Sequence, residues 1–138
     1  MLIAFASSDG ISVNQHFGWS KSFELYRVTE ESAEFIKTLD SSQDAIEDEH
    51  EKLAYKIGTV KEADIMFCSQ IGPTASKMVL AAKIYPMRSA ENERIDEAIK
   101  KLQELLLGNP PPWLLRIVYT SKEHSSAGLS AEENLALA

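Results

Sequence analysis

Short apolar runs separated by polar turns mark the strands that the first part of the sequence predicts. An apolar run over residues 2–6 ends at a Ser-Ser-Asp-Gly segment, whose Asp-Gly pair is a strong hairpin signal between extended segments. We therefore expect a first strand, a turn, and a return strand over residues 11–13. Further strands are expected over residues 23–28 and from Ala33 to about Leu39.

A helix is predicted to follow, because apolar residues recur there at helical spacing. The residues on its one apolar face are Ile46, Leu53, Ala54, Ile57 and Val60. His50 lies on the same face, so we expect it to pack at the edge of the core, with metal binding as the alternative. Acidic residues from Asp44 to Glu51 suit the dipole of this helix start, and we interpret them as a solvated loop and first turn rather than a hard-metal site.

The segment from Ile65 to Cys68 is apolar without interruption, which predicts a strand that is covered on both faces. Residues 69–74 follow as a strand-to-helix loop, with Pro73 at the first helical position, where its missing N–H costs nothing. The buried face of the helix that begins there is expected to comprise Ala75, Met78, Val79 and Ala82.

The remaining pattern predicts one strand and one long helix. Residues 84–87 are expected to form the last strand, and apolar residues from Ile95 to Leu106 trace an amphipathic helix that ends at Gly108. Antiparallel strands followed by strands that alternate with helices predict a single α/β domain, with a mixed sheet of about five strands and flanking helices. We place this domain at residues 1–116 and interpret residues 117–138 as a flexible C-terminal tail.

Size and composition fit one globular domain. The 138 residues are 44% hydrophobic and 25% charged, and a domain of this size buries about two-thirds of the surface that its unfolded chain exposes. The net charge of −7 and the lack of a basic run argue against nucleic-acid binding. No apolar run approaches the roughly 20 residues that span a bilayer, so no membrane segment is expected. A single cysteine and no signal-peptide pattern suit a reducing cytoplasm.

The loop around His16 is the first candidate site. His16 lies between two extended segments, where an imidazole can offer a free nitrogen to a soft or borderline metal. Gly18 would let the backbone pass close to a bulky ligand. The alternative is a loop histidine that makes a structural hydrogen bond, and the residues alone favour that alternative.

Residues 69–74 are the second candidate site, because α/β sheets place ligands where a strand ends and a helix begins. Free N–H groups at a helix start favour an anion, although any tight strand-to-helix turn would also use Gly72 and Pro73. Cys68 could ligate iron as a thiolate. The stronger interpretation from the residues is that Cys68 is a small buried hydrophobic side chain.

Motifs that are typical of enzymes are missing from the sequence. It contains no Ser nucleophile elbow, no His-Glu-x-x-His pair and no Cys-x-x-Cys pattern. Residues 69–74 lack the lysine of a Walker loop and the three glycines of a dinucleotide fingerprint. We therefore predict a binding protein rather than an enzyme, and no arrangement of acidic residues supports a hydrolase with a carboxylate-bound metal.

Several segments, taken in order, resemble the family of nitrogenase iron-molybdenum cofactor biosynthesis proteins. They are the Ser-Ser-Asp-Gly turn, the Val-Asn-Gln-His-Phe-Gly segment at residues 13–18, the strand and loop from Ile65 to Pro73, and residues 81–87. The last helix and the segment at residues 108–113 are similar to the NifX branch in particular. The resemblance covers roughly residues 1–116 and implies a ribonuclease H-like sheet order without implying nuclease activity.

The resemblance implies a carrier of a large, anionic iron-sulfur cluster, either the precursor that NifB makes or a later intermediate of the iron-molybdenum cofactor. The implied partners are NifB and the NifEN scaffold, with apo-dinitrogenase as a further candidate. By position in the family's His-Phe-Gly motif, His16 is the favoured cluster ligand, with Cys68 and His50 as other candidates. The residues expected to bind the cofactor are His16, Phe17, Gly18, Ser69, Gly72, Thr74 and Lys77, and Lys21, Lys77 and Lys83 are expected to offset its charge.

Two positions depart from the family's pattern. Gln15 stands where the family often has Asp or Glu, and Trp19 stands where it often has Arg. A single imidazole still suits a carrier, because each further ligand would slow release to the next protein. The alternative function is an interaction protein that docks on an assembly partner without holding metal and uses residues 110–113 as its anchor.

Overall fold

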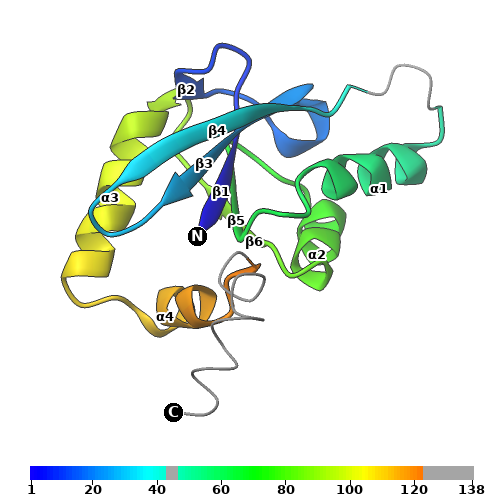
Figure 1. Cartoon of the computed structure of the whole chain (residues 1–138). Coiled ribbons are helices and arrows are strands. Elements are labelled where there is room, and N and C mark those ends of the chain that lie inside the picture. Colours follow the sequence, from blue (N-terminus) through cyan, green and yellow to red (C-terminus); the bar gives the residue numbers. More distant parts are fainter. Residues whose placement is uncertain (43–46, 123–138) are drawn as a thin grey trace.

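A five-stranded mixed sheet forms the centre of the computed structural model, which describes residues 1–42 and 47–122 (Figure 1). From edge to edge the strands are β4 (Ala33–Asp40), β3 (Ser22–Val28), β1 (Leu2–Ala6), β5 (Ile65–Cys68) and β6 (Tyr85–Arg88). Strand β3 is antiparallel to β1 and β4, whereas β5 is parallel to β1 and β6. The predicted α/β class and ribonuclease H-like sheet order are thereby confirmed.

Helices cover both faces of the sheet (Figure 1). They are α1 (Glu49–Thr59), α2 (Pro73–Ala81), α3 (Ile95–Leu107) and α4 (Pro112–Tyr119). Successive residues of a strand point to opposite faces, so the central strands supply two cores. Ala4 and Cys68 belong to the core with α1 and α2, whereas Phe5 and Phe67 stack at 5.1 Å between ring centroids in the core with α3 and α4.

The prediction of a hairpin after β1, based on the Asp-Gly pair, is wrong. Strand β2 (Ser12–Val13) pairs instead with β7 (Glu93–Arg94), a two-residue strand that precedes α3 and that the sequence does not predict. The physical reason is that β3 and β5 already occupy both edges of β1. The turn itself does form, because Gly10 has a φ of 75°, which glycine adopts without steric cost.

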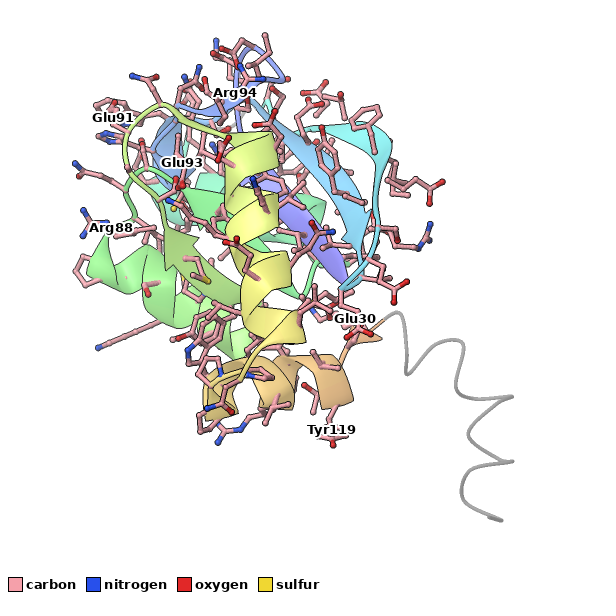
Figure 2. All side chains as sticks on the ribbon, turned by 90° about the vertical axis from the view of Figure 1, so that its left-hand side faces the viewer. Glu30, Arg88, Glu91, Glu93, Arg94 and Tyr119 are labelled. Carbon is pink, nitrogen blue, oxygen red and sulfur yellow. The ribbon has the colours of Figure 1, made fainter. Side chains whose placement is uncertain are left out.

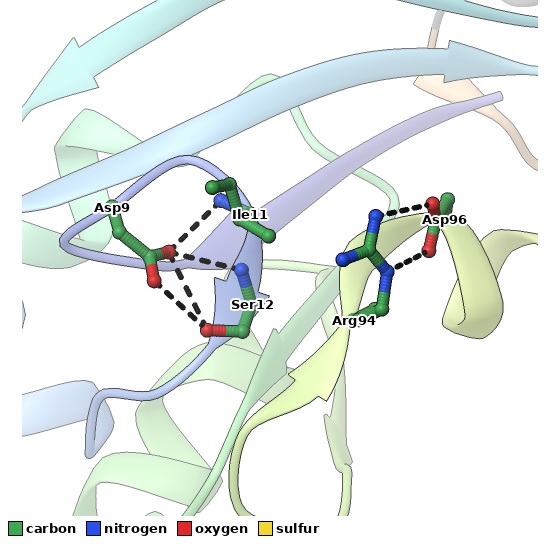
Figure 3. A network of polar contacts seen from close by, with 5 residues as sticks. All are labelled: Asp9, Ile11, Ser12, Arg94 and Asp96. Carbon is green, nitrogen blue, oxygen red and sulfur yellow. Dashed lines mark hydrogen bonds and ion pairs between the residues drawn. The ribbon is translucent and has the colours of Figure 1, made fainter.

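Asp9 fixes the conformation of this turn (Figure 3). One carboxylate oxygen of Asp9 accepts hydrogen bonds from the backbone N–H groups of Ile11 and Ser12, both at 2.9 Å. The other oxygen accepts the Ser12 hydroxyl at 3.1 Å. The backbone bonds from Ser12 and Ile11 stabilise the ionised form and lower the pKa of Asp9 to about 2.

We expect Asp9→Asn to remove an acid-sensitive contribution to stability. The pKa of this carboxyl is about 2 in the folded state against an ordinary 3.8, so the ionised group stabilises the fold above that ordinary value. That contribution is lost as the pH falls from about 4 to about 2. Denaturant unfolding of both proteins should show the largest difference in free energy near neutral pH and a shrinking one in acid. A difference that stays constant with pH would contradict the expectation.

The start of α1 corrects one prediction and supports another. Asp48 caps the helix by accepting the N–H of Glu51 at 2.9 Å, in keeping with a solvated, acidic first turn. His50 is exposed, so the prediction that it packs at the core edge is wrong. Because α1 begins only at Glu49, its first turn extends beyond the core. Ile46 and Asp44 lie outside the described residues.

The C-terminal part contains a helix that the sequence does not predict. Helix α3 ends at Leu107, before Gly108, as expected, but α4 then follows, with Leu114 and Ile117 buried against the sheet. Residues 117–122 are expected from the sequence to begin a flexible tail, but residues 117–119 form the end of α4, and Ser121 and Lys122 bond to the Asp64 carboxylate. Residues 123–138 of the expected tail lie outside the described residues. In the described part of the chain, no helix has the length and apolar character needed to cross a bilayer.

Candidate functional site

The two candidate loops lie side by side at the carboxyl end of β5. The N–H of Phe17 donates to the carbonyl of Gln70 at 2.8 Å, and the N–H of Ser69 donates to the carbonyl of Gln15 at 3.0 Å. His16 and Gln70 thereby form a short parallel bridge. The structure therefore brings the His16 loop next to residues 69–72, at the carboxyl ends of the parallel strands, where α/β folds bind ligands.

A short helical turn holds the His16 ring at the surface. The 3₁₀ helix η1 (Phe17–Trp19) begins directly after His16, whose carbonyl accepts the N–H groups of Trp19 and Ser20 at 3.1 and 3.0 Å. The Phe17 ring is fully buried and packs on Phe23 with centroids 5.8 Å apart. The imidazole of His16 stays partly exposed and stacks on the largely exposed Trp19 ring, with centroids 4.6 Å apart.

Lys56 supports this turn from the core side, and the sequence reasoning missed it. The side chain is 2% exposed, and its Nζ donates to the carbonyls of Gly18 at 3.0 Å and Ser20 at 2.6 Å. Burial lowers its pKa to about 8, so the amine is largely protonated at neutral pH. A signal was present, because position 56 lies on the same helical stripe as the apolar Leu53 and Val60.

The start of α2 offers free donors next to the His16 loop. Pro73 occupies the first turn, no side chain caps the helix, and no acidic residue lies in the first turn. The N–H groups of Thr74 and Ala75 precede the first intrahelical bond, which joins Ser76 N–H to the Gly72 carbonyl at 2.9 Å. Thr74, Gly72 and Lys77 are exposed, so this surface is accessible to an anion.

Gly18 is exposed, and a Cβ atom added there would meet no atom within 4 Å. Its backbone φ does not lie in the left-handed region, so neither the local fold nor neighbouring side chains require glycine at this position. The absence of a side chain instead leaves open space beside His16. The approach of a bulky ligand to the loop at this point stays a prediction.

Burial decides against Cys68 as a ligand. The side chain is fully buried, and burial raises its pKa to about 12, so it remains a thiol at neutral pH. Ser69 is also buried, and its hydroxyl has no hydrogen-bond partner among the described residues. The same holds for the hydroxyl of Ser89, which follows β6 at the same edge of the sheet. The backbone N–H of Ser69, in contrast, is bonded to Gln15 and joins the two loops.

The charged side chains at this edge differ in part from the expected ones. Lys77 and Lys21 are exposed on α2 and just after η1. Lys83 precedes β6 and lies at the opposite end of that strand from the His16 loop, so it does not belong to the site. Arg88, at the carboxyl end of β6, is an exposed cation at the end of the strand that faces the His16 loop (Figure 2). Its positive charge lies close enough to Cys68 to oppose the rise in the pKa of that thiol.

No closed metal site accompanies His16. In the parts of the chain that the structure describes, no three His, Cys, Asp or Glu side chains come together around a point that could hold an ion. His50 lies in the exposed first turn of α1, whereas Lys56, in the last turn of that helix, reaches the His16 loop. The arrangement thus offers one imidazole, free helix N–H groups and nearby cations.

Comparisons with known proteins identify the family of the chain. The family model described as "Dinitrogenase iron-molybdenum cofactor" matches residues 1–105. The NifX protein of Herbaspirillum seropedicae is 35% identical over 124 residues, covering 89% of this chain and 85% of that protein. NifX of Azotobacter vinelandii is 32% identical over 120 residues, covering 87% and 76%.

The solved structures agree at the level of the fold. The crystal structure of the protein PH0822 superposes with a TM-score of 0.59 at 18% identity, covering 75% of this chain and 91% of that one. The sheet order, the extent of the family match and the identity to NifX proteins lead to the same conclusion. The chain belongs to the dinitrogenase iron-molybdenum cofactor family.

Proposed function

We propose that this protein binds an iron-sulfur precursor of the iron-molybdenum cofactor and transfers it between cofactor-biosynthesis proteins. The observation that carries the proposal is the position of His16. Its partly exposed imidazole belongs to a backbone turn that Phe17 anchors, and backbone bonds join this turn to Ser69 and Gln70, just before the uncapped start of α2. Membership of the family supports the same class of cargo.

The chemistry of the site suits transient rather than permanent binding. An imidazole nitrogen of His16 can supply one bond to iron, and the N–H groups of Thr74 and Ala75 can donate to cluster sulfides. Lys77 and Arg88 supply positive charge at the same edge. With Cys68 buried as a thiol, few bonds hold the cargo, and few bonds must break when it leaves.

The transfer partners that fit this role are NifB as the source and the NifEN scaffold as the recipient, with apo-dinitrogenase as a later recipient. The alternative is a protein that docks on such a partner without holding metal. Its expected anchor, Trp113, is stacked on Tyr85 within this domain, with ring centroids 5.0 Å apart. That contact leaves Trp113 less available to a partner, so the carrier role is the better supported.

Anaerobic titration with the precursor that NifB produces tests the proposal. We expect the wild-type protein to comigrate with the cluster in gel filtration and to show its visible absorption, whereas His16→Ala loses most of the binding. His50→Ala is the matched control and should bind like the wild type, because His50 lies on the exposed first turn of α1.

Each failure of this titration has a distinct meaning. Equal binding by wild type and His16→Ala would remove His16 from the ligand set. Absence of binding by all three proteins would overturn the carrier proposal in favour of the docking protein.

A further inference from the structure

A buried ammonium group lies under the turn that presents His16. Lys56 extends from the last turn of α1, and its Nζ meets the carbonyls two and four residues beyond His16, at Gly18 and Ser20. The Ser20 carbonyl also accepts the hydroxyl of Ser41 at 2.8 Å. These bonds tie η1 to the end of β4 and to α1.

A charged group in this position has an unusual environment. Burying an ammonium costs free energy unless a carboxylate or strong hydrogen bonds compensate it, and for Lys56 the described residues provide backbone carbonyls and no carboxylate within ion-pair distance. The other lysine of α1, Lys52, is ordinary by comparison: it is more exposed and pairs with Glu49 at 3.7 Å. Holding the carbonyls of a short turn would not by itself require a charge, because Ser41 shows that a hydroxyl can do so.

The charge has a clear use if the ligand of the turn is an anion. Charges that are partly shielded from water act over several ångströms with less screening than surface charges. Lys56 is buried, whereas Gly18 is exposed with open space around its Cα, so the ammonium does not block the approach of a ligand from solvent. A fixed positive charge there favours an anion over a neutral or cationic ligand at no cost in side-chain ordering.

We propose that Lys56 is a positioning residue of the cargo site: its buried ammonium holds the Gly18 and Ser20 carbonyls and supplies the internal positive charge that makes the His16 turn select an anionic cluster. This inference rests on the proposed carrier function. It adds a residue that contacts neither the imidazole nor the exposed surface. The site then selects its cargo by negative charge, through electrostatic attraction to the ammonium of Lys56.

The test compares Lys56→Met with Lys56→Arg and Lys61→Met. Methionine has nearly the length of lysine without the charge, arginine keeps the charge and the donors, and exposed Lys61 gives the same change in net charge outside the site. Each protein is titrated anaerobically with the NifB-produced precursor, beside wild type and His16→Ala, and its thermal unfolding is recorded. Only folded protein is counted in the binding analysis.

We expect Lys56→Met to bind the precursor at least about tenfold more weakly than wild type, Lys56→Arg to recover part of that loss, and Lys61→Met to bind like wild type. A merely structural role would give similar losses for the methionine and arginine variants, in proportion to their loss of stability, and would overturn the inference. Wild-type affinity in Lys56→Met would overturn it too, while leaving the carrier function intact as long as His16→Ala is impaired. If wild type itself does not bind, the carrier function and this inference fail together.

Discussion

Phe17→Ala is expected to lower the free energy of unfolding by about 3–5 kcal/mol, the usual cost of replacing a buried aromatic ring by a methyl group. Phe17 is fully buried in the core with α1 and α2, where it packs on Phe23. Its backbone N–H also makes the bond to Gln70 that joins the two site loops. The substitution should therefore loosen the His16 turn as well as the core.

Urea unfolding measures the first effect, with Phe35→Ala as the matched control. Phe35 lies on the edge strand β4 and is 50% exposed, so its truncation should cost less than about 1 kcal/mol. Precursor titration of the folded Phe17→Ala protein measures the second effect and should show weakened binding. Equal unfolding free energies for the two variants would mean that the Phe17 pocket collapses around the smaller residue and that the turn does not depend on its ring.

The central strand and the start of α2 could be predicted because local signals and tertiary burial agree there. The apolar segment from Ile65 to Cys68 has neighbours on both edges and helices on both faces, which is what an uninterrupted apolar run requires. Pro73 begins α2 because its conformation and missing N–H fit the first turn. Both features are determined by residues that are consecutive in the sequence.

Features that depend on distant partners could not be read in the same way. The two residues of β2 find their partners in Glu93 and Arg94, about eighty residues later, and a two-residue strand has no periodicity to recognise. The Asp-Gly pair indicated a turn correctly, but not which strand the chain would meet next. Likewise, helical spacing placed His50 on the apolar face, although the core ends before the first turn of α1.

The candidate site was predicted as two separate loops, and its key contacts lie between them. The bonds of Gln70 to Phe17 and of Ser69 to Gln15 join segments about fifty residues apart, which no short motif reveals. Lys56 was overlooked because a lysine is normally interpreted as a surface residue. Its position on an apolar stripe is the one local sign that it turns inward.

Asp64→Ala is expected to lower the free energy of unfolding by about 3–5 kcal/mol, because buried donors that lose their acceptor each cost about 1–3 kcal/mol. The carboxylate is buried just before β5, and one of its oxygens accepts the N–H of Leu2 and the hydroxyl of Ser121, both at 2.9 Å. The other oxygen accepts the N–H of Lys122 at 2.8 Å. A single side chain therefore joins the beginning of β1, the beginning of β5 and the residues that follow α4.

The loss of stability should be concentrated at α4. This helix lies near the N-terminus of the chain, at the end of the sheet opposite to the His16 loop (Figure 1). Denaturant unfolding gives the total effect, and amide hydrogen exchange should show the largest loss of protection in α4. Asp96→Ala is the control, because Asp96 makes an exposed ion pair with Arg94 and should change stability little (Figure 3). Binding of the precursor should survive Asp64→Ala in folded protein, because the contacts of Asp64 and the candidate site lie at opposite ends of β5. Equal stability of the two variants would contradict the proposed role of Asp64 in joining β1, β5 and the residues after α4. Loss of precursor binding would show that the two ends of the sheet are coupled.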